Sequence, residues 1–262
     1  MINRQVLIDS FEEYVKGFDA EDERISLKIL HTYKVAENCE HLAAGLELRE
    51  EDAALSWAIG MLHDIGRFEQ VAASGSFIDS AASDHADAGA EFLFSEGRIA
   101  DFAPDASARE KNLMRLAILW HNKHQLPETL TDEELLFCRI IRDADKLDIF
   151  RVCCLNSFEA SHEYPPETVQ QSGISEAVID CFEKCSTLDY SLRREPADIY
   201  LGHIALCFGL YFPESRRLAI DQGYIEQMAD FTFTNAASQM QFEKLKAQLM
   251  NWLSPSDSAS SV

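Results

Sequence analysis

Long apolar runs, glycine-rich or proline-rich segments and basic clusters are all scarce in this sequence. No stretch reaches the roughly 18 apolar residues of a membrane span, and the first residues, MINRQVLIDS, lack the basic-then-apolar layout of a signal peptide. We therefore predict a cytoplasmic protein with no membrane partner. Only 11 glycines and 7 prolines accompany 47% hydrophobic residues, which argues against a fibrous or disordered chain and is typical of a globular one.

Positive charge is also in short supply. The 262 residues carry 23 Lys and Arg against 45 Asp and Glu, a formal net charge of −22. Because nucleic-acid affinity comes mainly from clustered Lys and Arg, we expect no long nucleic acid as a partner. Acidity by itself indicates a well-solvated surface, so small substrates stay open.

The seven cysteines are odd in number and form no C-x-x-C pair, so we expect reduced thiols. We interpret the pairs Cys153-Cys154 and Cys181/Cys185 as core or surface fillers. His162 lies in the segment SHEYPPET, which breaks the helical pattern, and His203 lies in an apolar stretch. We expect His203 to be a hydrogen-bonded core histidine.

Alternating strand patterns are rare and helical periodicity dominates, which predicts an all-α fold. The expected helices span roughly residues 23–46, 51–63, 83–94, 107–121, 132–154, 174–184, 197–212 and 236–252. Residues 71–82 have the composition of a loop. We expect an N-terminal helix within 1–22, a core at 23–155, a helical extension at 156–252 packed on that core, and a disordered tail at 253–262.

Two polar residues stand where an almost wholly apolar run ends, in GMLHDIGRF. Burying His63 or Asp64 costs several kcal/mol unless each is paired or bound to a cation. We expect Gly66 to end this helix, which lets both side chains reach one point. His31 lies on the second of two apolar stripes of the preceding helix, so it is predicted to point inward.

A later segment, IIRDADKLDIF, supplies a further carboxylate. Asp145 has an isoleucine four residues away on either side, which places it on an apolar helix face. Asp143 instead neighbours Arg139 and Lys146, so we predict an exposed, ion-paired residue there. We therefore choose Asp145 as the inward-facing aspartate.

Two imidazoles and two carboxylates that converge from buried helix faces suit a divalent cation. The four residues are His31, His63, Asp64 and Asp145. Metal binding would satisfy charges that the core otherwise could not hold. Histidine with carboxylate suits Mn, Fe, Co, Ni or Zn, and Mg less well, so the identity of the metal stays open.

The motifs ILHTYKVAE, GMLHDIGRF and IIRDADKLD, in this order, resemble the HD-domain superfamily of metal-dependent phosphohydrolases. The resemblance covers roughly residues 25–155 and implies an HD-domain helical bundle with additional C-terminal helices. It also implies that the four residues above are primary metal ligands, with Asp64 bridging to a second ion where there is one. Some branches carry two extra histidines, for which His85 and His121 are the candidates here. His85 falls in the first turn of its helix, where the helix dipole favours a neutral imidazole; the alternative is a histidine bonded only to the loop.

The implied reaction is hydrolysis of a small phosphorylated substrate, such as a nucleotide, by metal-activated water. We predict a phosphomonoesterase or phosphodiesterase with one or two divalent ions. The predicted catalytic residues are Asp64, Arg67 and Lys146, and the predicted substrate contacts are Arg67, Lys123, His124 and Lys146. Each of these cations has a plain alternative as a solvated or salt-bridged residue. Asp148 would orient a ligand, act as a base or form a salt bridge.

One branch of the superfamily, which cleaves cyclic di-GMP, carries a Gly-Tyr-Pro segment after its paired histidines. The corresponding stretch here reads HNKHQLPETL, so we do not expect that substrate. The competing interpretation is a non-catalytic, HD-like signalling or scaffold protein. Such relatives usually lose ligands, and the full set retained here favours the enzyme. The oligomeric state stays open.

Overall fold

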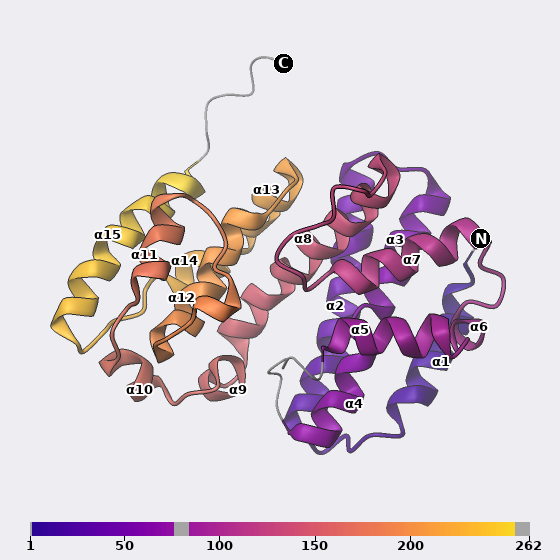
Figure 1. Ribbon diagram of the computed structural model, residues 1–262, viewed down its shortest axis with the longest axis horizontal. Helices are drawn as coiled ribbons and strands as arrows, with labels where there is room; N and C mark the ends of the chain where they lie inside the picture. Colours follow the sequence, from indigo (N-terminus) through magenta and orange to yellow (C-terminus); the bar gives the residue numbers. More distant parts are fainter. Residues whose placement is uncertain (1, 76–83, 255–262) are drawn as a thin grey trace, which may run out of the picture. The chain divides into compact units, whose positions relative to one another are not determined.

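The computed structural model describes residues 2–75 and 84–254, and among these it contains helices and no β-strand (Figure 1). The predicted all-α fold is therefore confirmed. The chain divides into two compact units, residues 1–148 and residues 149–262.

The first unit is built around two neighbouring helices, α2 (Glu23–Gly45) and α3 (Glu50–Leu62). At Gly60 of α3 an added Cβ would lie only 2.6 Å from Cα of Ala36 in α2, so a glycine is needed for this close approach. Fully buried side chains from several elements fill the core, among them Phe11, Leu42, Leu55, Phe68 and Phe137. The helices are α1 (Arg4–Val15), α2 (Glu23–Gly45), α3 (Glu50–Leu62), α4 (Ile65–Ser74), α5 (His85–Ala90), α6 (Ile99–Phe102), α7 (Ala108–Trp120) and α8 (Asp132–Leu155), with a π-helical turn at Glu91–Ser95. The part of α8 from residue 149 onward belongs to the second unit.

Capping residues fix the starts of the helices that carry the site. Asp22 accepts from the backbone N–H of Arg24 at the start of α2, and Asp84 caps α5. Ser107 and Glu110 form a reciprocal capping box at the start of α7. Each such cap contributes about 1 kcal/mol to helix stability. The predicted helix starts near residues 23, 84 and 107 are confirmed.

The prediction that Gly66 ends a helix is wrong. Helix α3 ends at Leu62, α4 begins at Ile65, and the short break between them carries His63 and Asp64. Gly66 lies inside α4, where an added Cβ would be 2.4 Å from the His85 carbonyl oxygen. The glycine therefore serves close packing of α4 on α5 rather than a helix terminus.

The loop predicted at 71–82 is also wrong in part. Residues 71–74 continue α4, and Gly75, with φ +64°, caps its C-terminal end. Glycine adopts this left-handed conformation without the steric cost that a Cβ would bring. Residues 76–82 of the predicted loop lie outside the described residues.

The second unit contains seven further α-helices in its described part. They are α9 (Phe158–His162), α10 (Pro166–Gln171), α11 (Glu176–Glu183), α12 (Pro196–Ala205), α13 (Pro213–Gln222), α14 (Tyr224–Met228) and α15 (Ala236–Leu253). The apolar stretch predicted as one helix to residue 212 leaves the α-helix after Ala205, and a 3-10 turn follows. Leu253, predicted to begin the tail, is instead the buried last residue of α15, and residues 255–262 lie outside the described part.

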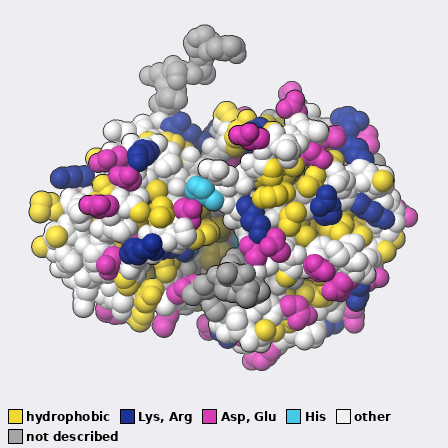
Figure 2. Space-filling model, in the orientation of Figure 1, with side chains coloured by type: hydrophobic (Ala, Val, Ile, Leu, Met, Phe, Trp, Pro, Cys, Tyr) yellow, Lys and Arg dark blue, Asp and Glu magenta, His cyan; other side chains and the backbone are white. Residues whose placement is uncertain are grey.

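Neither unit contains a helix that is both long and apolar enough to cross a bilayer, as far as the described residues go. All seven cysteines are free thiols, as predicted. On the face seen in Figure 2, basic side chains are scattered among acidic ones.

Candidate metal centre

Six predicted ligands come together within the first unit, from helices that are far apart in sequence. His31 lies in the middle of α2, and the His63-Asp64 pair occupies the break between α3 and α4. His85 is the first residue of α5, and His121 directly follows α7. Asp145 lies on α8. The histidines are almost completely buried, with residue exposures of 5% or less.

One carboxylate oxygen of Asp64 faces the first pair of histidines. Its Oδ2 lies 3.6 Å from Nε2 of His31 and 3.6 Å from Nε2 of His63. Oδ1 of Asp145 lies 3.2 Å and 3.8 Å from the same two nitrogens. The four residues predicted from their positions on helix faces and helix ends therefore surround one point.

The other oxygen of Asp64 faces the second pair of histidines. Its Oδ1 lies 3.3 Å from Nε2 of His85 and 3.7 Å from Nε2 of His121. These two nitrogens are 3.0 Å apart. Ligands at 2.0–2.2 Å from one ion are separated by about 3 to 3.5 Å, so both groups have nearly the spacing of a coordination sphere. A carboxylate whose two oxygens face two such groups is placed to bridge two ions.

The imidazoles are held in the tautomer that a metal requires. Three of them donate their Nδ1–H away from the centre, which leaves Nε2 deprotonated and directed toward Asp64. The donor–acceptor distances are 2.7 Å from His31 to Asp148 Oδ2, 2.8 Å from His63 to the Gly60 carbonyl and 2.7 Å from His121 to the Ile118 carbonyl. Nε2 of His31 and Nε2 of His63 are buried without a hydrogen-bond partner. Buried polar atoms are seldom left unsatisfied, so these nitrogens fit a cation.

Burial and neighbouring charges set the protonation states. Burial lowers the pKa of His63 to about 3, so its imidazole is neutral at physiological pH. Burial alone would oppose ionisation of Asp64, but the Lys28 ammonium, 2.7 Å from Oδ2, and His63 outweigh it and lower the pKa of Asp64 well below its usual range. The pKa of Asp145 is lowered in the same way, since its contact with His31 outweighs its burial. Burial and Lys28 oppose protonation of His31, but its contacts with Asp145 and Asp148 outweigh them and raise its pKa. The centre thus offers two ionised carboxylates and a neutral imidazole at His63.

Lys28 is a residue of this centre that the sequence analysis missed. It lies three residues before the inward-facing His31 on α2, so helical spacing alone was a signal that it faces the same side. Only 14% of its side chain is exposed.

Of the four predicted substrate contacts, Arg67 lies beside the centre, Lys123 and Lys146 contact other residues, and His124 is exposed. The Arg67 guanidinium lies 3.1 Å from Nε2 of His85 and 3.9 Å from Oδ1 of Asp64. Lys123 instead pairs with Asp84 at 2.7 Å and with Asp87 at 3.0 Å. Lys146 is buried and donates to the Arg142 carbonyl at 2.9 Å, while His124 is exposed.

The predicted exposure of Asp143 is wrong, although its predicted ion pair with Lys146 is present at 3.9 Å. Asp143 is 1% exposed, because this part of α8 is surrounded on nearly all sides and the four-residue spacing does not mark an open face there. Asp145, with 18% of its side chain exposed, is the more accessible of the two. Of the roles left open for Asp148, its bond to His31 fits the orienting one.

One protein-family model, that of the HD domain, matches part of the chain. Residues 29–149 match the HD domain, and this range contains all six converging residues. The chain contains an HD domain. HD domains bind divalent metals and are generally metal-dependent phosphohydrolases. Among curated proteins and among solved structures, no match to this HD-domain protein was found.

Proposed function

We propose that this HD-domain protein is a metal-dependent phosphohydrolase that hydrolyses a small phosphoester such as a nucleotide. One observation carries the proposal: the two oxygens of Asp64 face two separate sets of imidazole nitrogens inside a buried centre. A purely structural cluster would have no reason to keep the Nε2 atoms of His31 and His63 unsatisfied.

The donor set fits two divalent transition-metal ions. His31, His63, Asp145 and Oδ2 of Asp64 would hold one, and His85, His121 and Oδ1 of Asp64 would hold the other. Nitrogen with carboxylate oxygen suits Mn, Fe, Co, Ni or Zn better than Mg. Bound divalent ions supply a water of lowered pKa and neutralise phosphate oxygens.

The chain's own residues would then position the substrate. The Arg67 guanidinium is adjacent to the centre, so it can donate to a phosphate oxygen and stabilise the charge that grows on the phosphoryl group. Lys28, already at Asp64, would add a second positive charge on the same side. Lys123 would act indirectly, since it holds Asp84 and Asp87 at the start of α5, where His85 lies.

The test is metal analysis of the purified protein, followed by hydrolysis of an aryl phosphate and of a nucleotide panel with added Mn, Co, Ni, Zn or Mg. We expect metal-dependent turnover that Asp64→Ala abolishes together with metal retention. Asp101→Asn is the matched control, because Asp101 is an exposed aspartate paired with Arg98 at the surface. Bound metal without turnover on any substrate would favour the non-catalytic interpretation, and absence of bound metal would remove the proposal altogether.

A further inference from the structure

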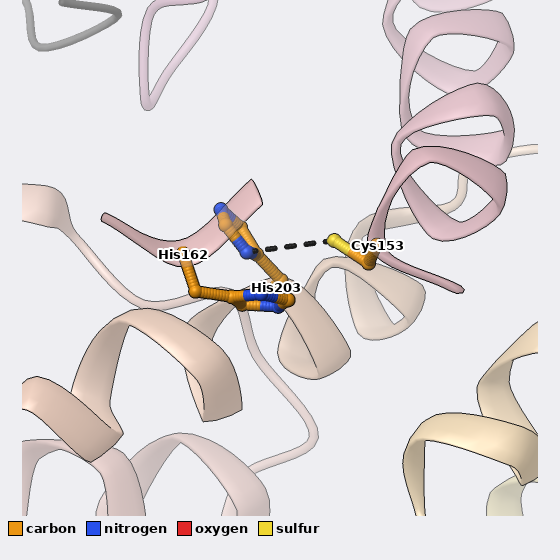
Figure 3. A group of neighbouring side chains, drawn as sticks. All are labelled: Cys153, His162 and His203. Atoms are coloured by element: carbon orange, nitrogen blue, oxygen red, sulfur yellow. Dashed lines mark hydrogen bonds between the residues drawn. The ribbon is translucent and has the colours of Figure 1, made fainter. Parts of the chain in front are cut away.

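A second group of metal-ligating side chains lies in the second unit (Figure 3). Cys153 comes from the C-terminal end of α8, His162 is the last residue of α9, and His203 lies on α12. Their ligand atoms all lie within 4.8 Å of one another. None of these residues belongs to the centre described above.

One sulfur–nitrogen distance in this group matches the distance between two ligands of a tetrahedral zinc site. Sγ of Cys153 lies 3.6 Å from Nδ1 of His203, the contact drawn as a dashed line in Figure 3. A zinc ion with Zn–S of about 2.3 Å and Zn–N of about 2.0 to 2.1 Å separates these two atoms by about 3.5 to 3.6 Å at the tetrahedral angle. The two side chains would need almost no movement to share such an ion.

His162 offers an unsatisfied nitrogen to the same group. Its residue is 0% exposed, its Nδ1–H donates to the Phe158 carbonyl at 3.0 Å, and its Nε2 is buried without a hydrogen-bond partner. The Phe158 ring stacks on the imidazole at 4.4 Å and fixes its orientation. This outward tether with a free Nε2 is the arrangement that metal-binding histidines adopt.

The protonation states also suit ligation. Burial lowers the pKa of His162 to about 4, and burial, with His162 and the Arg193 guanidinium, lowers the pKa of His203 well below its usual range. Both imidazoles are therefore neutral at physiological pH. The positive charge of Arg193 opposes binding of a metal cation nearby. Ionisation of the Cys153 thiol to a thiolate would offset this repulsion.

We propose that Cys153, His162 and His203 bind one Zn(II)-class ion, with water or another small ligand in the fourth position. Binding forms the metal–sulfur bond and releases the thiol proton to solvent, with no change of oxidation state. Such an ion would tie the end of α8 to α9 and α12, and so stabilise the second unit. The sequence alone suggested only a filler cysteine and a hydrogen-bonded core histidine at two of these positions.

Cobalt(II) is the probe that separates this site from the first centre. A thiolate bound to Co(II) gives an intense ultraviolet charge-transfer band, and the first centre contains only nitrogen and oxygen ligands. We expect Co(II) titration of the full chain to produce this band with a final amplitude of one thiolate-bound cobalt per chain, beside any Co(II) that the first centre binds without the band, and Zn(II) to displace it. Cys153→Ser should abolish the band, and His203→Gln should weaken cobalt binding at this site at least tenfold.

Cys154→Ser is the matched control, because Cys154 is the neighbouring thiol and contacts the Tyr224 carbonyl instead. It should leave the band unchanged. Circular dichroism of each variant checks folding, and His203→Gln keeps the test open should Cys153→Ser not fold. A wild-type protein without the band, or a band that survives in folded Cys153→Ser, overturns the proposal. Neither outcome bears on phosphoester hydrolysis, which the band does not report.

Discussion

The hydrogen bond between Asp148 and His31 gives the sharpest quantitative prediction about the first centre. Asp148 Oδ2 accepts from Nδ1 of His31 at 2.7 Å, and 2% of each side chain is exposed. A buried hydrogen bond to a charged group is worth about 1.5 to 3 kcal/mol. Since about 1.4 kcal/mol corresponds to a tenfold change in an equilibrium constant, removing it should weaken binding of the ion held by His31 by about 10-fold to 100-fold.

Two substitutions of Asp148 should weaken metal binding to different extents. Asn at position 148 keeps an oxygen acceptor but loses the charge, so Asp148→Asn should raise the dissociation constant for Mn²⁺ by about 10-fold. Asp148→Ala removes the acceptor, releases the imidazole to rotate, and should raise it by about 100-fold. Isothermal titration calorimetry of metal-free protein at one fixed pH measures both values.

Asp143→Asn serves as the control on the same helix. Asp143 is buried and pairs with Lys146, so its loss should cost about 1 to 3 kcal/mol of stability and leave the Mn²⁺ dissociation constant within threefold. If Asp148→Ala binds Mn²⁺ as tightly as the wild type while remaining folded, the reasoning that His31 is oriented by Asp148 is refuted. A larger loss of affinity in Asp143→Asn would refute the choice between the two aspartates.

Three further predictions follow from the same contacts. Gly66→Ala should destabilise the protein by about 1 to 3 kcal/mol in urea denaturation, because the new Cβ would lie 2.4 Å from a carbonyl oxygen of α5. Gly173→Ala is the control, because the nearest atom to its new Cβ is 3.7 Å away, and it should change stability far less. Equal losses of stability in the two variants would contradict this reasoning. Lys28→Gln should tighten Mn²⁺ binding several-fold, because the Lys28 ammonium competes with the metal for Asp64. In metal-free protein, kept so by a chelator, the same substitution should lower the melting temperature, because the ion pair with Asp64 is lost. An unchanged Mn²⁺ affinity would show that the ammonium does not compete with the metal. Arg67→Ala should raise KM for phosphoesters about tenfold or more with metal content unchanged, and loss of metal instead would assign Arg67 to ligand positioning.

The part of this site that the sequence predicts depends on local signals. An apolar stripe places His31 inward, and a polar pair at the end of an apolar run marks His63 and Asp64 as residues in need of a partner. The capping residues near 23, 84 and 107 likewise mark helix starts by chemistry that involves only a few neighbours. Each of these features can be read from one helix at a time.

The features that the sequence does not predict depend on contacts between helices. The role of Gly66 is set by the α5 backbone, which no local pattern reveals. Asp143 is buried because neighbouring elements cover that face of α8 as well. The group of Cys153, His162 and His203 forms only when three separate elements pack together, and each residue alone has an ordinary interpretation.

The most direct test of the account is anomalous X-ray diffraction from crystals grown with Mn²⁺. The account predicts two anomalous peaks about 3.5 to 4 Å apart. One should lie among His31, His63, Asp145 and Oδ2 of Asp64, and the other beside His85, His121 and Oδ1 of Asp64. Density for Mn²⁺ elsewhere, or the same side chains packed together with no anomalous peak between them, would contradict it.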